Sequence, residues 1–421
     1  MIPLPDAQAR ILDAVAPLPP RSHARADALD LVLAEDVVAR EPVPPFANTG
    51  MDGYAVRAAD TAEVPARLRV VDELPAGTAP TRAVGPGEAI RIMTGAPVPD
   101  GADAIVIVEV TSNEGDEVVI TQAAVVGDHV RPAGGDLRED QPVFAAGTVL
   151  TPAHIGVLAS LGIDEVRCHP RPRVGVLSTG DELVERGALP LGSIRDSNRP
   201  MLLAVLAESG FTAVDYGIAR DDEAEIAERI ATAVDECDAL LTSGAVSMGD
   251  FDYVKVVLER LAAEQAGNGF TWLQVAIKPA KPLAFGTIGR DDSAATGGER
   301  RVESTPRQIP VFGLPGNPVS SRVSYELFAR PALRRMTGRQ VLHNPIVRAI
   351  AQTGFARRPD GKLHLDRVRV RLEDGRYRCE RAGFQASNVL SGMADAQGLA
   401  LIPDGDGVEA GAEIEVLLLG P

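Results

Sequence analysis

Two carboxylates, Asp250 and Asp252, follow a run of small residues near the middle of the chain. That run includes Ser243 and Gly244, begins where an apolar segment at residues 238–242 ends, and leads into a segment of helical periodicity. Backbone N–H groups at such a strand-to-helix turn can hold an anion. Since carboxylates would repel a bare phosphate, they fit this turn best if a divalent cation lies between them. An ordinary turn capped by Asp is the alternative that this stretch alone leaves open.

Three other turns of similar composition follow apolar runs. They are Leu177-Ser-Thr-Gly-Asp-Glu-Leu183, Ile218-Ala-Arg-Asp-Asp222 and Val311-Phe-Gly-Leu-Pro-Gly-Asn-Pro-Val-Ser-Ser321. In an open parallel sheet, ligands bind where the strands end. We therefore expect Ser, Thr and Gly donors there, surrounded by six carboxylates: Asp181, Glu182, Asp221, Asp222, Asp250 and Asp252. That set suits a phosphorylated ligand held through Mg²⁺.

Two lysines lie close together in Ile277-Lys-Pro-Ala-Lys-Pro282. Each lysine precedes a proline, and prolines restrict the backbone on both sides, so both charges are held in place. Lysines are usually solvated surface residues, which is the alternative interpretation. The proline spacing and the apolar strand that follows favour an anion-binding role.

Turn residues are also dense in three segments before residue 140. The segments are Phe46-Ala-Asn-Thr-Gly-Met-Asp-Gly-Tyr-Ala55, Ile92-Met-Thr-Gly-Ala-Pro-Val-Pro-Asp-Gly-Ala-Asp103 and Val130-Arg-Pro-Ala-Gly-Gly-Asp136. Taken singly, each is best interpreted as a turn. No P-loop, dinucleotide fingerprint, nucleophile elbow or zinc-ligand spacing is present in the sequence.

The elements that must position these residues divide the chain into regions of different periodicity. Residues 172–338 alternate strand-like and helix-like segments, which predicts an α/β domain with a parallel sheet covered on both faces. Residues 41–139 and 339–421 are strand-like, and the second of these has an Asp-Gly hairpin signal at residues 374–375. Residues 1–40 and 140–171 form a predicted discontinuous linker domain.

Inside that linker domain, residues 151–162 have the pattern of a helix with Thr151 as N-cap and Pro152 at its first position. We expect this helix to pack on the N-terminal helix, which would make the strand-like region between them an insertion. The predicted fold class is thus α/β plus β.

The composition excludes several classes of partner. The chain has 421 residues and a formal net charge of −17, which argues against nucleic acid and anionic membranes. Three scattered cysteines indicate neither a disulfide framework nor a zinc site. No signal peptide or membrane-spanning apolar run is present, so we expect a cytoplasmic protein.

Seven motifs, taken together and in order, resemble the molybdopterin molybdenumtransferase family, which includes bacterial MoeA proteins and the E domain of gephyrin. The motifs are Met51-Asp-Gly-Tyr-Ala-Val56, Ile92-Met-Thr-Gly-Ala-Pro97, Leu177-Ser-Thr-Gly-Asp-Glu-Leu183, Asp196-Ser-Asn198, Ser243-Gly-Ala-Val-Ser-Met-Gly-Asp250, Lys278-Pro-Ala-Lys-Pro282 and Gly313-Leu-Pro-Gly-Asn-Pro-Val319. The chain departs from the family at Ala245 and Ala280, where glycine is usual, and at Gln274, where some bacterial members have lysine. The substituted loops are therefore expected to sit slightly differently, with one cation fewer.

The resemblance implies an enzyme that inserts molybdate into adenylylated molybdopterin and releases AMP. It implies a central molybdopterin-binding α/β domain, an inserted mainly-β domain, a small helical linker domain and a C-terminal domain similar to a β-barrel. It also implies a homodimer that can contact a molybdopterin adenylyltransferase.

By motif, the resemblance assigns catalysis to Asp52, Glu182, Asp222 and Asp252, the last three also holding Mg²⁺. It assigns substrate binding to Thr94, Arg131, Asp136, Ser178, Thr179, Gly180, Ser243, Gly244, Ser247, Lys278, Lys281, Pro315, Pro318, Arg367 and Ser387. Two alternative functions remain. The α/β domain alone would suggest a molybdopterin adenylyltransferase, and the expected dimer would suit a scaffold similar to gephyrin.

Overall fold

The computed structural model describes residues 1–244, 253–264, 269–290 and 307–420. These residues form two compact units, which are described separately. The first unit comprises Met1–Arg21, Asp30–Ala34 and Arg167–Pro421, and the second comprises Ser22–Leu29 and Glu35–Val166. None of the described helices is both long and apolar enough to span a bilayer.

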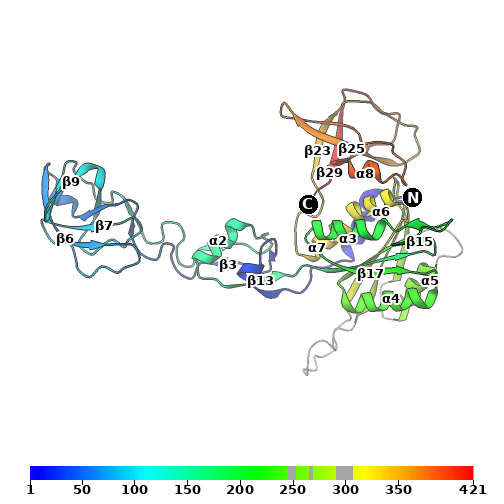
Figure 1. The fold of residues 1–421 in the computed structure, drawn as a ribbon, viewed down its shortest axis with the longest axis horizontal. Coiled ribbons are helices and arrows are strands. Elements are labelled where there is room, and N and C mark those ends of the chain that lie inside the picture. Colours follow the sequence, from blue (N-terminus) through cyan, green and yellow to red (C-terminus); the bar gives the residue numbers. More distant parts are fainter. Residues whose placement is uncertain (245–252, 265–268, 291–306, 421) are drawn as a thin grey trace, which may run out of the picture. The chain divides into compact units, whose positions relative to one another are not determined.

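A six-stranded sheet forms the centre of the first unit, with helices on both of its faces (Figure 1). The strand order is β17-β14-β18-β22-β21-β19. The bounds are β14 Arg173–Thr179, β17 Thr212–Ala219, β18 Ala239–Ser243, β19 Gly269–Gln274, β21 Pro282–Arg290 and β22 Arg307–Leu314.

Alternate side chains along these strands enter two separate cores. Val176 and Leu241 pack with α1 (Leu4–Asp13), α3 (Asn198–Glu208) and the α6–α7 segment (Pro318–Met336). Their neighbours Leu177 and Leu240 pack on the opposite face, with α4 (Glu223–Glu236) and α5 (Tyr253–Glu264). Successive residues of a strand point to opposite faces, so both helix layers are anchored by the same strands. The predicted covering of both faces is confirmed.

The sheet departs from the predicted parallel arrangement at one edge. Strands β17, β14, β18 and β22 are parallel neighbours, whereas β21 runs antiparallel to both β22 and β19. Between β19 and β21 the chain has only residues 275–281, which contain a short strand, β20 (Ile277–Lys278), and no helix. A parallel return would need a crossover of a dozen or more residues. Because β19 runs in the same direction as β22, its end still lies at the edge where the parallel strands end.

The C-terminal part of the first unit is a closed β-barrel, as the family resemblance implies. Its strands are β23 (Ile346–Ala351), β25 (Leu363–Glu373), β26 (Arg376–Arg381), β27 (Gly398–Ile402) and β29 (Glu413–Leu418). They pair in the order β25-β26-β23-β29-β27, and a β25–β27 pairing closes the ring. The predicted hairpin turn is present at Asp374 and Gly375, both with positive φ, 50° and 74°. Two left-handed residues are what a two-residue turn needs to follow the twist of its strands.

Strand β20 pairs in parallel with β25 of the barrel, with Lys278 opposite His364. The segment that carries the two predicted lysines is therefore hydrogen-bonded to the barrel as well as covalently joined to the α/β sheet.

The second unit is built on another six-stranded sheet, in the order β8-β5-β7-β6-β10-β9. Its strands are β5 Gly53–Val56, β6 Ala66–Leu74, β7 Glu88–Ile92, β8 Ala104–Ile107, β9 Thr111–Glu114 and β10 Glu117–Ile120. Two apolar clusters lie on its two faces, for example Tyr54 and Val56 on one and Ala55 on the other.

The helix predicted over residues 151–162 is α2 (Pro152–Ser160), with Thr151 and His154 forming a capping box. It lies in the second unit, where it packs on the 3₁₀ turn Arg25–Asp27. The N-terminal helix α1 lies in the first unit and packs on α7 (Arg330–Met336). Each helix is thus packed within its own unit, and the expected pairing of the two helices stays a prediction.

Candidate active site

The ends of β14 and β18 come close together at the carboxyl edge of the α/β sheet, and glycine makes this possible. Gly244 has φ of 125°, and a Cβ added to it would lie 2.3 Å from the carbonyl oxygen of Thr179. Gly180 has φ of 145°, and a Cβ there would lie 2.5 Å from a carboxylate oxygen of Glu182. Gly244 therefore excludes a side chain through both backbone conformation and space, because it faces main chain. At Gly180 the exposed Glu182 side chain can move, so only the positive φ disfavours a side chain there.

A cavity of about 450 Å³ opens at these strand ends, and we call it the hydroxyl cavity. Its walls include the predicted residues Ser178, Thr179, Glu182, Ser243, Gly244, Pro315 and Pro318. They also include Pro282, from the start of β21, and the segment Asp196-Ser-Asn198. The two serines and Thr179 are almost completely buried. The prediction that these strand ends lie together is confirmed by the geometry.

The predicted carboxylates occupy different environments. Glu182 is exposed and lines the hydroxyl cavity. Asp222 is the N-cap of α4, where its side chain accepts a hydrogen bond from the Glu225 N–H at 2.8 Å. Asp181 and Asp221 each accept a 3.3 Å hydrogen bond from the other's backbone N–H, which ties the two turns together.

The predicted Mg²⁺ set is only partly described. Asp252, with Ser247, Asp250 and Ala245, lies outside the described residues. Among residues that the structure does describe, no group of three His, Cys, Asp or Glu side chains is arranged to hold a metal ion. Glu182 and the remaining oxygen of Asp222 are of the donor type that Mg²⁺ takes. The Mg²⁺ site stays a prediction.

A second, larger cavity of about 1050 Å³ lies between the lysine segment and the barrel, and we call it the basic cavity. Lys278, Lys281 and Ser387 line it, as do Arg358 and Arg381. Pro282 belongs to the walls of both cavities. Ala280, between the lysines, has φ of 71° although it is not glycine, and its methyl group is buried in the core. Ala280 is therefore in a left-handed conformation that disfavours a non-glycine residue, and burial of its methyl group offsets part of that cost.

Arg367 does not line the basic cavity, but its hydrogen bonds support the loop that forms one wall of the cavity. Its side chain is 1% exposed, and its guanidinium donates to the backbone oxygens of Phe384 at 2.6 Å, Ala386 at 3.1 Å and Val389 at 3.0 Å. Those carbonyls belong to the loop that carries Ser387. Burial lowers the pKa of Arg367. Its contact with the substrate stays a prediction, whereas its three hydrogen bonds to backbone oxygens support the loop.

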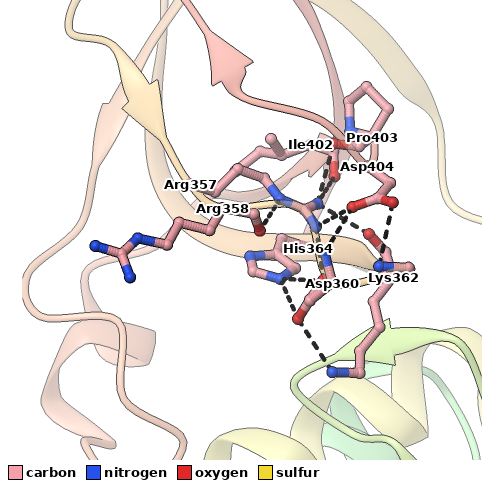
Figure 2. A network of polar contacts seen from close by, with 9 residues as sticks. Arg357, Arg358, Asp360, Lys362, His364, Ile402, Pro403 and Asp404 are labelled. Atoms are coloured by element: carbon pink, nitrogen blue, oxygen red, sulfur yellow. Dashed lines mark hydrogen bonds and ion pairs between the residues drawn. The ribbon is translucent and has the colours of Figure 1, made fainter.

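Sequence reasoning missed the residues that form the other wall, which Figure 2 shows. The Arg357 guanidinium donates to backbone oxygens of Lys362, Ile402 and Pro403 and to the carboxylates of Asp360 and Asp404. Hydrogen bonds from Lys362 and His364 lower the pKa of Asp360 to about 2. The neighbouring Arg358 points away from this network and is exposed (Figure 2). In the sequence, only the adjacent arginines Arg357 and Arg358 before Pro359 could have indicated this wall.

The remaining predicted residues lie in the second unit. Asp52 accepts hydrogen bonds from the Thr94 hydroxyl at 2.6 Å and the Thr94 N–H at 2.7 Å, and both lower the pKa of Asp52. Arg131 lies on β11 (Val130–Arg131), which pairs with β4 (Asn48–Thr49) just before Asp52. Asp136 lies in the following turn, its N–H bonded to the Val43 carbonyl. Asp52, Thr94 and Arg131 thus belong to one group of loops.

The fold and these cavities define a class of protein: a multidomain protein with a central molybdopterin-binding type of α/β domain. Three family models match the chain in order. The MoeA N-terminal region (domains I and II) matches residues 2–162, the probable molybdopterin binding domain matches 175–335, and the MoeA C-terminal region (domain IV) matches 348–419.

Similarity to individual proteins extends over almost the whole chain. Molybdopterin molybdenumtransferase 2 of Mycobacterium tuberculosis is 38% identical over 393 residues, 92% of each chain. The molybdopterin molybdenumtransferase of Bacillus subtilis is 31% identical, covering 93% of this chain and 88% of the relative. The crystal structure of the molybdopterin biosynthesis MoeA protein of Pyrococcus horikoshii matches all of both chains, with a TM-score of 0.77 and 28% identity. The chain belongs to the molybdopterin molybdenumtransferase family.

Proposed function

We propose that this protein catalyses the insertion of molybdate into adenylylated molybdopterin, with release of AMP. The observation that carries the proposal is the basic cavity. In a chain whose formal net charge is −17, Lys278, Lys281 and Arg358 line one cavity. Arg381 also lines it, paired at 2.8 Å with the Asp366 carboxylate of the same wall, and the hydroxyl cavity shares a wall residue with it. Cations held in place at a concave site bind an oxyanion such as molybdate, which an acidic surface would repel.

The two cavities suit the two substrates. Ser178, Thr179 and Ser243 offer hydroxyl groups without net charge, which suits hydrogen bonding to the phosphate and heterocycle of an adenylylated pterin. The lysines suit the small tetrahedral dianion. Holding both ligands side by side would convert a bimolecular step into an effectively unimolecular one.

We further propose that the reaction depends on Mg²⁺ held by Glu182, Asp222 and Asp252. Carboxylates near a phosphoanhydride need a cation to offset their mutual repulsion, and Mg²⁺ would supply that charge. A homodimer, a cytoplasmic location and contact with a molybdopterin adenylyltransferase are part of the same proposal, and they rest on the family. The protein acts, in this proposal, on neither nucleic acid nor membranes.

The test is to incubate the purified protein with adenylylated molybdopterin, with and without molybdate and Mg²⁺, and to measure AMP. We expect AMP release that requires both ions. Release independent of molybdate would contradict the transferase. Formation of adenylylated molybdopterin from molybdopterin and ATP would instead favour the adenylyltransferase alternative. The scaffold alternative predicts neither reaction, and variants of the lysines would then leave the protein's function intact.

A further inference from the structure

The motif Asp196-Ser-Asn198 connects the ends of three strands. Asp196 accepts a hydrogen bond from Ser178 Oγ, at the end of β14, at 3.1 Å. Asn198 Nδ2 donates to Ser243 Oγ, at the end of β18, at 2.8 Å, and to the Gly316 carbonyl oxygen, just after β22, at 2.7 Å. This short segment, at the start of α3, therefore reaches three turns at the edge of the sheet.

The orientation of the Asn198 amide is fixed by its partners. The carbonyl oxygen of Gly316 can only accept, so the atom that faces it must be the NH₂ group. Both amide protons are then used, one by each partner. Within the described part of the chain, Asn198 Oδ1 is buried and has no hydrogen-bond partner. Buried polar atoms rarely lack partners, and such an atom at a cavity wall is a signal of a ligand.

The contacts give the two serines opposite hydrogen-bonding roles. Ser178 gives its proton to Asp196, a carboxylate that also accepts from Arg199 Nε at 2.9 Å, so Ser178 keeps only lone pairs. Ser243 accepts from Asn198 and, among the residues that the structure describes, donates to none, so its own proton is available to another acceptor. Both serines line the hydroxyl cavity.

We propose that Asn198 is a positioning residue that presets Ser243 as a hydrogen-bond donor to a phosphate oxygen of the adenylylated substrate. A phosphate oxygen can only accept, so it matches Ser243 and not Ser178. Without Asn198, the Ser243 proton could turn to the Gly316 carbonyl or another oxygen, and the cavity would lose a preorganised donor. This inference rests on the proposed function, because it takes the adenylylated substrate as the ligand.

The test uses AMP as the probe and measures its Kd by calorimetry with Mg²⁺ present. The variants are Asn198→Ala, Ser243→Ala and the double variant. A hydrogen bond to a charged group contributes enough that each single variant should weaken AMP binding about 10- to 100-fold. Because both remove the same donor, the double variant should bind no more weakly than Ser243→Ala. The control is Thr242→Val, which removes the neighbouring buried hydroxyl but does not belong to the cavity wall.

Thermal unfolding separates positioning from folding. Asn198→Asp keeps the shape of the side chain, so it replaces the alanine variant if that variant does not fold. Because the ionised carboxylate of Asp cannot donate a hydrogen bond to Ser243, Asn198→Asp should also weaken AMP binding. Unchanged Kd in a folded Asn198 variant, or losses that multiply in the double variant, would overturn the inference and leave the proposed function standing. Failure of the wild-type protein to bind AMP would overturn both, since the hydroxyl cavity would then not hold the nucleotide.

Discussion

The hydroxyl cavity and the basic cavity share Pro282, yet their walls are built from different chemistry. The hydroxyl cavity is made from strand ends of one sheet, where glycines bring the backbones together and short side chains are held by their neighbours. The basic cavity is made where two folded parts meet, and long cationic side chains line it. The first kind of wall can fix the direction of a hydrogen bond, whereas the second supplies charge and tolerates movement.

Different changes should therefore impair the two cavities. A hydrogen-bond direction that is fixed by buried contacts is lost when the backbone that holds the partners moves. A field produced by several cations is lost only when charges are removed. Variants should therefore separate the two cavities by their effects on the nucleotide and on molybdate.

The largest effect is expected for Gly244→Ala. Its Cβ would lie 2.3 Å from the Thr179 carbonyl oxygen, and its φ of 125° disfavours any side chain. The strand ends must then separate, so we expect AMP release to fall more than about 100-fold, with the free energy of unfolding lowered by about 1–3 kcal/mol. Gly156→Ala, in helix α2 and with open space around it, is the matched control. Normal activity of Gly244→Ala would show that the close approach is dispensable.

Removing both lysines should affect the other cavity. Lys278→Met and Lys281→Met together keep most of the side-chain volume and remove two cations from the basic cavity. We expect the KM for molybdate to rise roughly 30- to 100-fold, since charged hydrogen bonds contribute about 1.5–3 kcal/mol each and exposed ones less. The Kd for AMP should stay within about twofold. An equal loss for both ligands would mean that the two cavities act as one.

Two arginines provide a comparison within the basic cavity. Arg358→Met removes an exposed guanidinium and should raise the KM for molybdate several-fold, about 5-fold, while leaving the melting temperature unchanged. Arg367→Met leaves three carbonyl oxygens of the Ser387 loop without their donor, so it should lower the free energy of unfolding by about 2–4 kcal/mol. Steady-state kinetics of both variants measure the KM for molybdate, and urea unfolding of both variants measures the free energy of unfolding. If Arg367→Met were as stable as wild type, its direct role in binding molybdate would regain support.

The smallest effect concerns acid stability. The pKa of Asp360 is lowered to about 2 in the folded protein by Lys362 first and then by His364. An unfolded Asp has a pKa near about 3.9, so the ionised carboxylate stabilises the fold above that pH, and the contribution disappears as pH falls toward about 2. Wild type should be slightly more stable than Asp360→Asn at pH 6, and the difference should shrink between about pH 4 and pH 3. Urea unfolding at several pH values measures it, and a difference independent of pH would contradict the assignment.

Local signals in the sequence were enough to predict several elements. The Asp-Gly pair specified the turn at residues 374–375, and Thr151 followed by Pro152 specified the start of α2. The hydroxyl cavity was also predictable, because apolar runs that end in Ser, Thr and Gly mark strand ends, and parallel strands end at one edge.

Contacts between distant residues could not be predicted in this way. The antiparallel β21 is different, because the connection of residues 275–281 is too short for a parallel return and could have indicated it; the apolar pattern of the strand alone does not. Arg358 and Arg367 look alike in the sequence, and only the barrel decides that one is exposed and the other buried. Arg357 and its partner Asp404 are 47 residues apart in the sequence. Asn198 is 45 residues from its partner Ser243 and 118 residues from its partner Gly316.

The pairing of β20 with β25 makes the lysine segment part of two structures at once. Lys278 lies opposite His364 in that pairing, while Pro282, four residues later, already begins a strand of the α/β sheet. Any rotation of the barrel relative to the α/β sheet would therefore move Lys278 as well, because main-chain hydrogen bonds join its strand to the barrel. A movement of the barrel that changes the size of the basic cavity would therefore also change the position of its lysine charges.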